Sequence, residues 1–212
     1  MFIIIQRKME LSDKECLEVA EKWAVEQTLA EETDILDSQY QQLLSKRIIL
    51  INDIISDTTI SKIMMPLLEM DNDGTGDKIT IYINTNGGSV FDGLVLCDII
   101  ERLKTKTDVI VLGYAYSMGS LILMSGKNNP NVTRYCYPFS TALIHGVSSF
   151  VSGTSSQVKD YFRFNEKYEQ RIAKFIVSHT NLSEDDYAAI ERYEAYMDSD
   201  EMLEKGLIDE IL

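Results

Sequence analysis

The segment ITIYINTNGGSVFDGLVLCDIIERLKTKTDVIVLGYAYSMGSLILM, residues 79–124, contains two successive units of strand, turn and helix. Each unit opens with a short apolar run that is rich in β-branched residues, at 79–83 and at 109–112. A turn follows each run, and the chain then continues with apolar residues at helical spacing. Two such units in succession imply parallel strands joined by right-handed crossovers. We therefore expect an α/β fold with a twisted β-sheet of repeated strand–turn–helix units.

The sequence on both sides of this segment continues the pattern. Upstream, residues 48–51 predict a strand and residues 57–69 a helix. Downstream, we expect strands at 132–137 and 141–144, a long helix at 155–178, a short helix near 184–192 and a terminal strand at 207–212. Thr154 and Gln157 have the spacing of a capping box for the long helix, whose apolar stripe is interrupted by the polar Asn165.

The N-terminal part of the chain differs from the rest in composition. It is rich in Glu and Asp, and apolar residues at helical spacing predict an acidic helix over Glu10–Glu32 followed by a connector. We therefore divide the chain into an acidic helical extension, residues 1–40, and a main domain, residues 41–212.

The composition excludes several classes of function. With 20 Lys and Arg against 34 Asp and Glu, the net charge of -14 disfavours nucleic acid as a partner. The three cysteines are widely spaced, so neither a disulfide framework nor a zinc site is expected, and we expect no metal or cofactor. The apolar run at residues 2–5 is too short for a signal peptide or a membrane span, which predicts a cytoplasmic chain without a membrane partner.

Ser117 follows the second strand and opens the helix after it. A side chain at such a turn meets both solvent and the positive end of the helix dipole, which suits a nucleophile, although a serine there is also an ordinary helix N-cap. The pair Gly87-Gly88 follows the preceding strand and, taken alone, is consistent with a plain tight turn. Adjacent parallel strands would bring the two turns together, so the backbone N–H groups of Gly88 and Met118 could bind one oxyanion.

A serine nucleophile needs a general base, and the chain has 2 histidines. His145 ends the apolar run 142–144, which would present its imidazole at the edge of the sheet. His179 lies at the end of the long helix, where histidine commonly caps carbonyl groups. We favour His145 as the base and keep His179 as the alternative.

Three blocks, 84–90, 116–120 and 143–145, resemble the signature segments of the proteolytic subunit of the Clp protease (ClpP) and come in that family's order. The resemblance extends over about residues 43–212. It implies a ClpP/crotonase-like fold in which helix 155–178 is a protruding handle. It also implies a serine endopeptidase with Ser117 as nucleophile, His145 as general base, and the N–H groups of Gly88 and Met118 as the oxyanion hole.

The third member of the catalytic triad departs from the family pattern. At the position where the family has aspartate, this chain has Glu194. A glutamate can still orient the imidazole. Asp198 is a rival for this role, and loss of a functional acid is the remaining alternative.

The resemblance also implies partners. The family assembles stacked seven-membered rings, a tetradecamer, and hydrolyses unfolded chains or peptides inside the chamber, with ATP used by an AAA+ unfoldase. This chain has no phosphate-binding Gly-x-x-x-x-Gly-Lys-Ser/Thr loop of its own. The long helix could form the ring contact or pack only on its own core, and residues 1–40 could be a propeptide, a pore element, a docking surface or a solvated helix. Alternatives to the leading function are a virus-head maturation protease, an inactive ring component and, last, an acyl-CoA enzyme of crotonase type.

Overall fold

The computed structural model of the chain describes residues 18, 21, 22, 25, 37–148, 151–190 and 192–212. They belong to two compact units, Met1–Lys46 and Arg47–Leu212. The helix expected over Glu10–Glu32 lies mostly outside the described residues, although its described positions, 18, 21, 22 and 25, are helical and exposed. A further helix covers residues 37–45. The division of the chain after residue 40 stays a prediction.

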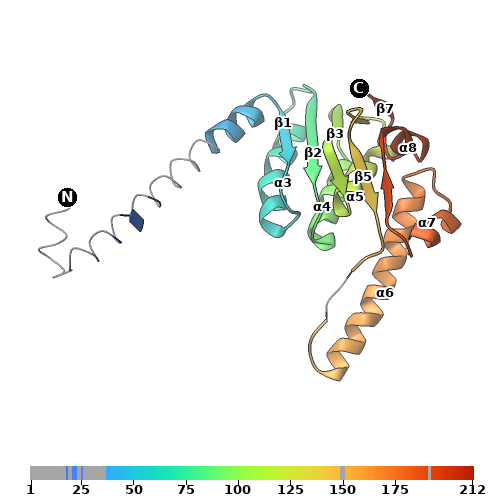
Figure 1. Cartoon of the computed structure of the whole chain (residues 1–212). Coiled ribbons are helices and arrows are strands. Elements are labelled where there is room, and N and C mark those ends of the chain that lie inside the picture. Colours follow the sequence, from blue (N-terminus) through green and yellow to red (C-terminus); the bar gives the residue numbers. More distant parts are fainter. Residues whose placement is uncertain (1–17, 19–20, 23–24, 26–36, 149–150, 191) are drawn as a thin grey trace, which may run out of the picture. The chain divides into compact units, whose positions relative to one another are not determined.

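The unit Arg47–Leu212 is built on a seven-stranded sheet (Figure 1). Its strands are β1 (Ile48–Ile51), β2 (Ile79–Thr85), β3 (Thr107–Tyr116), β4 (Val132–Cys136), β5 (Thr141–Ile144), β6 (Ala195–Met197) and β7 (Glu210–Ile211). The path β1-β2-β3-β4-β7 is parallel throughout, while β5 runs parallel to the C-terminal part of β3 and pairs antiparallel with β6. The expected α/β fold with a mostly parallel sheet is confirmed.

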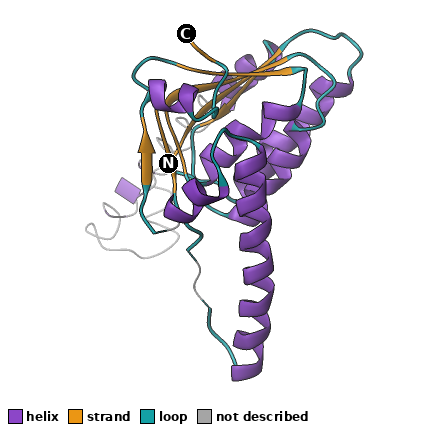
Figure 2. Ribbon diagram, turned by 90° about the vertical axis from the view of Figure 1, so that its right-hand side faces the viewer, coloured by secondary structure: helices purple, strands orange, loops and turns teal. Residues whose placement is uncertain are grey.

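The helices between the first strands cover one face of this sheet. They are α3 (Asp57–Asn72), α4 (Val90–Ile100) and α5 (Met118–Met124), with a 3-10 turn, η1 (Ser125–Asn128), after α5. Since β1 to β4 lie in chain order in a parallel sheet, right-handed crossovers place these helices on the same face (Figures 1 and 2). The C-terminal part adds α6 (Ser155–Ser178), α7 (Glu184–Ile190) and α8 (Ser199–Glu204).

The core lies between the sheet and these helices. Along β2 the odd-numbered residues are buried and the even-numbered ones are half-buried, as the period of two in a strand requires. Ile79, Ile81 and Ile83 are fully buried, as are Leu96 and Ile100 of α4. Burying one such side chain contributes about 1.5–3 kcal/mol, so these residues hold the carboxyl ends of the strands at fixed positions.

Helix α6 has the expected bounds and begins with the expected capping box. The side chain of Gln157 accepts a hydrogen bond from the Thr154 N–H at 2.9 Å, and Thr154 Oγ1 accepts one from the Gln157 N–H at 3.4 Å. Only Asn165, Ile172 and Ile176 are buried among its 24 residues. The N-terminal half of the helix extends away from the sheet (Figures 1 and 2).

The C-terminal strand is shorter than expected. Only Glu210 and Ile211 pair with β4, while Leu207 and Ile208 are buried in the turn after α8. Arg134 holds this turn, because its guanidinium donates to the carbonyl oxygens of Gly206 and Leu207 and to the carboxylate of Asp209. Strand β6 and helix α8 were not predicted, because elements of 3 and 6 residues are too short to show a period.

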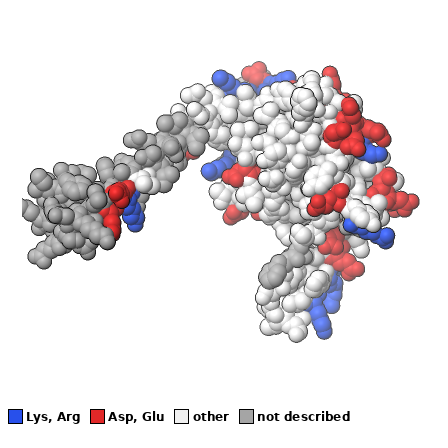
Figure 3. Space-filling model, in the orientation of Figure 1, with Lys and Arg blue, Asp and Glu red and all other residues white. Residues whose placement is uncertain are grey.

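The surface of this unit is acidic where the C-terminal helices lie. Exposed residues in the first turns of α7 and α8 are Glu184, Asp185, Asp186, Asp200 and Glu201. Figure 3 shows Asp and Glu side chains gathered on that side of the unit. Among the described residues, no helix is both long and apolar enough to cross a membrane.

Candidate active site

Ser117 occupies a strained turn between β3 and α5. Its backbone has a φ of 53° and a ψ of -119°, a conformation that L-residues other than glycine rarely adopt. The Ser117 N–H donates to the carbonyl of Leu143 at 2.8 Å, which ties the turn to β5. Ser117 stands at the N-cap position, but its side chain makes no capping hydrogen bond. The hydroxyl is therefore left for another role, as at the nucleophile turn of many hydrolases.

The glycine pair lies directly against this turn. A Cβ atom on Gly87 would lie 2.6 Å from the Tyr116 carbonyl oxygen and 2.9 Å from the Met118 nitrogen, and one on Gly88 would lie 2.3 Å from the Ile55 carbonyl oxygen. The φ angles of Gly87 and Gly88, 92° and 147°, also favour glycine. Gly87 thus allows its loop to touch the Ser117 turn, and Gly88 allows the same loop to pair with Ile55.

The backbone N–H groups of Gly88 and Met118 are placed by these two turns. Ile55 and Gly88 form an isolated parallel bridge in which the hydrogen bonds use the Gly87 carbonyl and the Ser89 N–H, so the N–H of Gly88 points away from Ile55. Met118 is the first residue of α5, and an N–H in the first turn of a helix has no carbonyl of that helix to bind. Two backbone donors therefore lie beside Ser117.

A cavity of about 60 Å³ is lined by most of the residues that we predicted for the active site. Gly88, Ser117, Met118 and His145 all line it, together with Ile172 and Ile176 of α6. The structure thus brings together four of the five residues that we expected at the site. Sequence reasoning missed the contribution of α6, although the apolar stripe of that helix was the signal for it.

His145 is half-buried at the end of β5, and its ring is held by the backbone. Nδ1 lies 2.6 Å from the carbonyl oxygen of Gly146. Since a carbonyl only accepts, this contact requires the proton on Nδ1 and leaves Nε2 of the neutral ring free to take a proton. Among the described contacts, Ser117 and His145 form no direct hydrogen bond, as is common in hydrolases without substrate.

Glu194 lies at the start of strand β6, which pairs with the strand before His145, but its carboxylate has another partner. In the β5–β6 ladder Ile144 is opposite Ala195, so the next residues in register are His145 and Glu194. The ladder ends at the pair of Ile144 and Ala195, so His145 and Glu194 follow directly after its last pairing. The exposed Glu194 carboxylate instead accepts a hydrogen bond from the Tyr196 hydroxyl, and this bond and the negative charge raise the pKa of Tyr196.

Asp198, the rival third member, has a structural partner. Its side chain accepts a hydrogen bond from the Glu201 N–H at 2.9 Å, and Glu201 accepts one from the Asp198 N–H at 3.0 Å. This capping box starts α8. The β5–β6 register, continued by one residue beyond its last pair, brings Glu194 and not Asp198 opposite His145.

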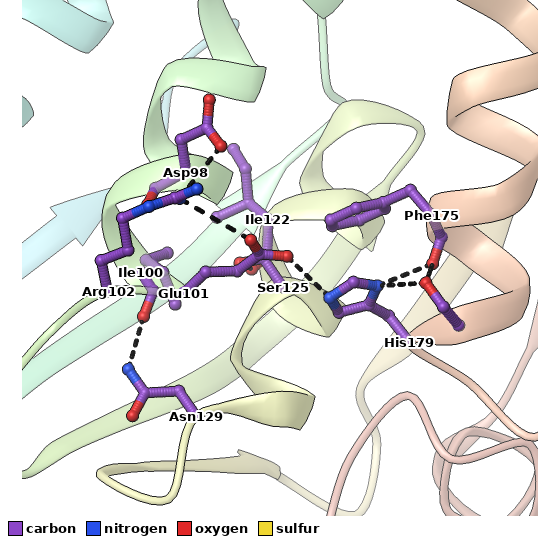
Figure 4. Close-up of polar contacts among 10 residues, drawn as sticks. Asp98, Ile100, Glu101, Arg102, Ile122, Ser125, Asn129, Phe175 and His179 are labelled. Carbon is purple, nitrogen blue, oxygen red and sulfur yellow. Dashed lines mark hydrogen bonds and ion pairs between the residues drawn. The ribbon is translucent and has the colours of Figure 1, made fainter.

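His179, the alternative base, caps α6 and does not line the Ser117 cavity. Its Nδ1 lies 2.8 Å from the Phe175 carbonyl oxygen and 2.9 Å from Ser178 Oγ. Nε2 lies 2.7 Å from the carboxylate of Glu101, at the end of α4 (Figure 4). This buried histidine connects two helices.

Comparisons with known proteins show which family the chain belongs to. A model of the Clp protease family matches residues 31–212, a range that includes every residue of the candidate site. The chain belongs to the Clp protease family. A curated relative, the ATP-dependent Clp protease proteolytic subunit of Carsonella ruddii (strain PV), is 32% identical over 173 residues, which are 82% of this chain and 87% of the relative. These matches identify this Clp protease family member as a proteolytic subunit and do not favour the virus-head protease, the inactive ring component or the acyl-CoA enzyme.

Proposed function

We propose that this Clp protease family member is a serine endopeptidase whose nucleophile is Ser117. One observation carries the proposal: a serine with a φ of 53° lines the same cavity as His145 and the backbone of Gly88 and Met118. A strained turn persists only where the surrounding structure holds it, and such turns gather at active sites.

Each group has a defined role in this mechanism. His145 Nε2 takes the proton of the Ser117 hydroxyl while Oγ attacks the scissile carbonyl carbon. The N–H groups of Gly88 and Met118 stabilise the oxyanion, and loss of one such donor costs about 2.7–4 kcal/mol. His145 then returns the proton to the leaving amine, and water enters by the same route to hydrolyse the acyl-enzyme.

In this proposal Glu194 is the acid of the catalytic triad, which orients His145. Its position directly after the last β5–β6 pair, on the strand end that adjoins His145, supports the assignment, and the role requires that the carboxylate turn from Tyr196 to the imidazole. Until that change occurs, the Gly146 carbonyl holds the imidazole in the tautomer that the reaction requires. The carboxylate would then add its charge when the imidazolium forms.

We also propose that the chain acts within stacked heptameric rings. The N-terminal half of α6 supports this, because Phe162 is 59% and Phe164 49% exposed. A helix that packed only on its own core would bury such side chains. The name of the Carsonella ruddii relative, an ATP-dependent proteolytic subunit, supports an AAA+ unfoldase as partner and unfolded polypeptides as substrates.

An active-site probe tests the catalytic proposal. A fluorophosphonate should label the purified chain on the peptide that contains Ser117, and both labelling and peptide cleavage should be lost in Ser117→Ala. Labelling that persists in Ser117→Ala would refute the assignment. Mass photometry tests the assembly, which predicts a mass of fourteen chains; a stable monomer at micromolar concentration would contradict it.

A further inference from the structure

A second, larger cavity adjoins the one that contains Ser117. Its volume is about 300 Å³, and it lies between the start of α4, residues 147 and 148, and one face of α6. Gly88, Val90 and Ile172 line both cavities. A side chain of a peptide bound at Ser117 can therefore enter this second cavity.

Asn165 is a buried polar residue in the lining of this cavity. It is the polar residue that interrupts the apolar stripe of α6, and only 8% of it is exposed. Within the described part of the chain, its side-chain amide makes no hydrogen bond to protein. Among the described residues, the fully buried side-chain atoms without a hydrogen-bond partner do not include the Asn165 amide, so this amide opens onto the cavity and is available to a ligand group there.

The neighbours of Asn165 indicate the chemistry of that group. Glu169 lies one helical turn along α6, is half-buried and is the only charged residue among those that line the cavity in the described structure. Phe91 and Tyr168 add aromatic rings whose centroids are 4.8 Å apart. A carboxylate, an amide oxygen and ring faces together favour a cation or an N–H donor over an acid or an alkyl group.

One cation already lies near these rings. The guanidinium of Arg171 is 5.5 Å from the centroid of the Tyr168 ring, but Arg171 is exposed and does not line the cavity. It therefore leaves the acceptor atoms of Asn165 and Glu169 available inside the cavity.

We propose that this cavity is a substrate subsite for a basic side chain, arginine or lysine, and that Asn165 is its specificity-determining residue. The inference rests on the proposed function, since the subsite serves a peptide held at Ser117. The methylene stem of the side chain packs on Val90 and Ile172, while its N–H groups donate to the Asn165 amide oxygen and the Glu169 carboxylate.

Binding to an inactive variant tests this proposal without relying on catalysis. The probes are fluorescein-labelled hexapeptides of alanine and glycine with one variable residue: arginine, lysine, methionine or glutamate. Fluorescence polarisation with the full-length Ser117→Ala variant should show arginine and lysine peptides binding about tenfold more tightly than the methionine peptide, as one hydrogen bond to a charged group predicts. The glutamate peptide should bind most weakly.

Variants of the cavity separate its two polar groups. In the Ser117→Ala background, Asn165→Leu should bring the arginine-to-methionine affinity ratio close to one, while Asn165→Asp should raise it. Glu169→Gln should lower the ratio, and Glu166→Gln, an exposed control on the same helix, should leave it unchanged. Thermal unfolding checks that each variant folds. If Asn165→Leu does not fold, the comparison with Asn165→Asp alone decides the test.

The outcomes are distinct from those of the catalytic test. Equal binding of arginine and methionine peptides, a ratio that Asn165→Asp leaves unchanged, or no binding of any peptide would overturn the subsite. Loss of the proposed catalysis would appear instead as an unsubstituted chain that binds the arginine peptide and never cleaves it.

Discussion

The two histidines of this chain lie in contrasting surroundings. His179 is buried, stacks on Phe175 at a centroid distance of 4.0 Å and has a carboxylate 2.7 Å from Nε2. His145 is half-buried, contacts a backbone carbonyl through Nδ1 and lines the cavity of Ser117. The histidine with the carboxylate partner is thus the one away from the nucleophile. A pair of histidine and carboxylate therefore identifies a catalytic base only when a nucleophile lies within its reach.

The largest expected effect is on His145. We predict that His145→Ala lowers kcat for peptide cleavage by at least about 10⁴-fold, since removing the base of a serine protease costs up to about 10⁶-fold. The melting temperature should hardly change, because the half-buried ring has one backbone contact. Steady-state kinetics and thermal unfolding on the same preparation measure both. A variant that retains a tenth of the activity would remove His145 from the mechanism.

The next effect separates the two candidate acids. We predict that Glu194→Gln lowers kcat by at least about 10²-fold. The loss should be smaller than the roughly 10⁴-fold seen for a triad aspartate, because the Gly146 carbonyl still holds the His145 ring in the required tautomer. Asp198→Asn, the matched control, should leave kcat within about threefold while weakening the cap of α8 by about 1 kcal/mol. If the two variants exchange these effects, Asp198 is the orienting acid.

His179 should affect stability and not chemistry. Its removal takes away the imidazole contact with the Glu101 carboxylate and the stacking on Phe175, so we predict that His179→Ala lowers the free energy of unfolding by about 2 kcal/mol. Chemical denaturation measures this. Arg102→Gln, shown beside it in Figure 4, is the comparison: Arg102 is exposed and pairs with Asp98 at 3.1 Å and with Glu101 at 3.7 Å, and the loss of these surface ion pairs should cost less than about 1 kcal/mol.

An unchanged unfolding free energy in His179→Ala, or a loss of kcat in a folded sample, would contradict the structural role of this histidine.

The smallest effect concerns Tyr196. The hydrogen bond to Glu194 and its negative charge raise the pKa of the phenol above the ordinary value of 10.0. The contact therefore stabilises the fold at pH values below the ordinary pKa, and this contribution is lost as pH rises through the raised pKa. We expect Glu194→Gln to return the Tyr196 titration toward its ordinary value, measured as the ultraviolet difference between each protein and its Tyr196→Phe variant. An unshifted titration would show that Glu194 is already turned to His145.

Most of the site could be predicted from sequence because it depends on local patterns. Ser117, Gly88 and Met118 follow runs of β-branched residues, and two neighbouring parallel strands bring their ends together. His145 ends a strand that follows the same pattern. The position of each residue along the sheet was therefore implied by the period of its own segment.

The unpredicted features depend on pairings between distant segments. The register of β6 against β5, which ends directly before His145 and Glu194, involves three residues with no readable period. The partner of Glu194 depends on one side-chain rotation, and the contact of His179 with Glu101 joins the ends of two helices. Asn165 was visible as a break in a stripe, but the cavity that it lines is formed by three separate segments.

The backbone of Ser117 sets stability and catalysis against each other. A positive φ costs a residue with a Cβ roughly 1–2 kcal/mol, a cost that glycine does not bear. A library of variants sorted only for resistance to heat should therefore enrich glycine at position 117, and the enriched proteins would be sturdier and chemically inert. Sorting by turnover would return serine, so the residue recovered at this one position reports which property the selection rewarded.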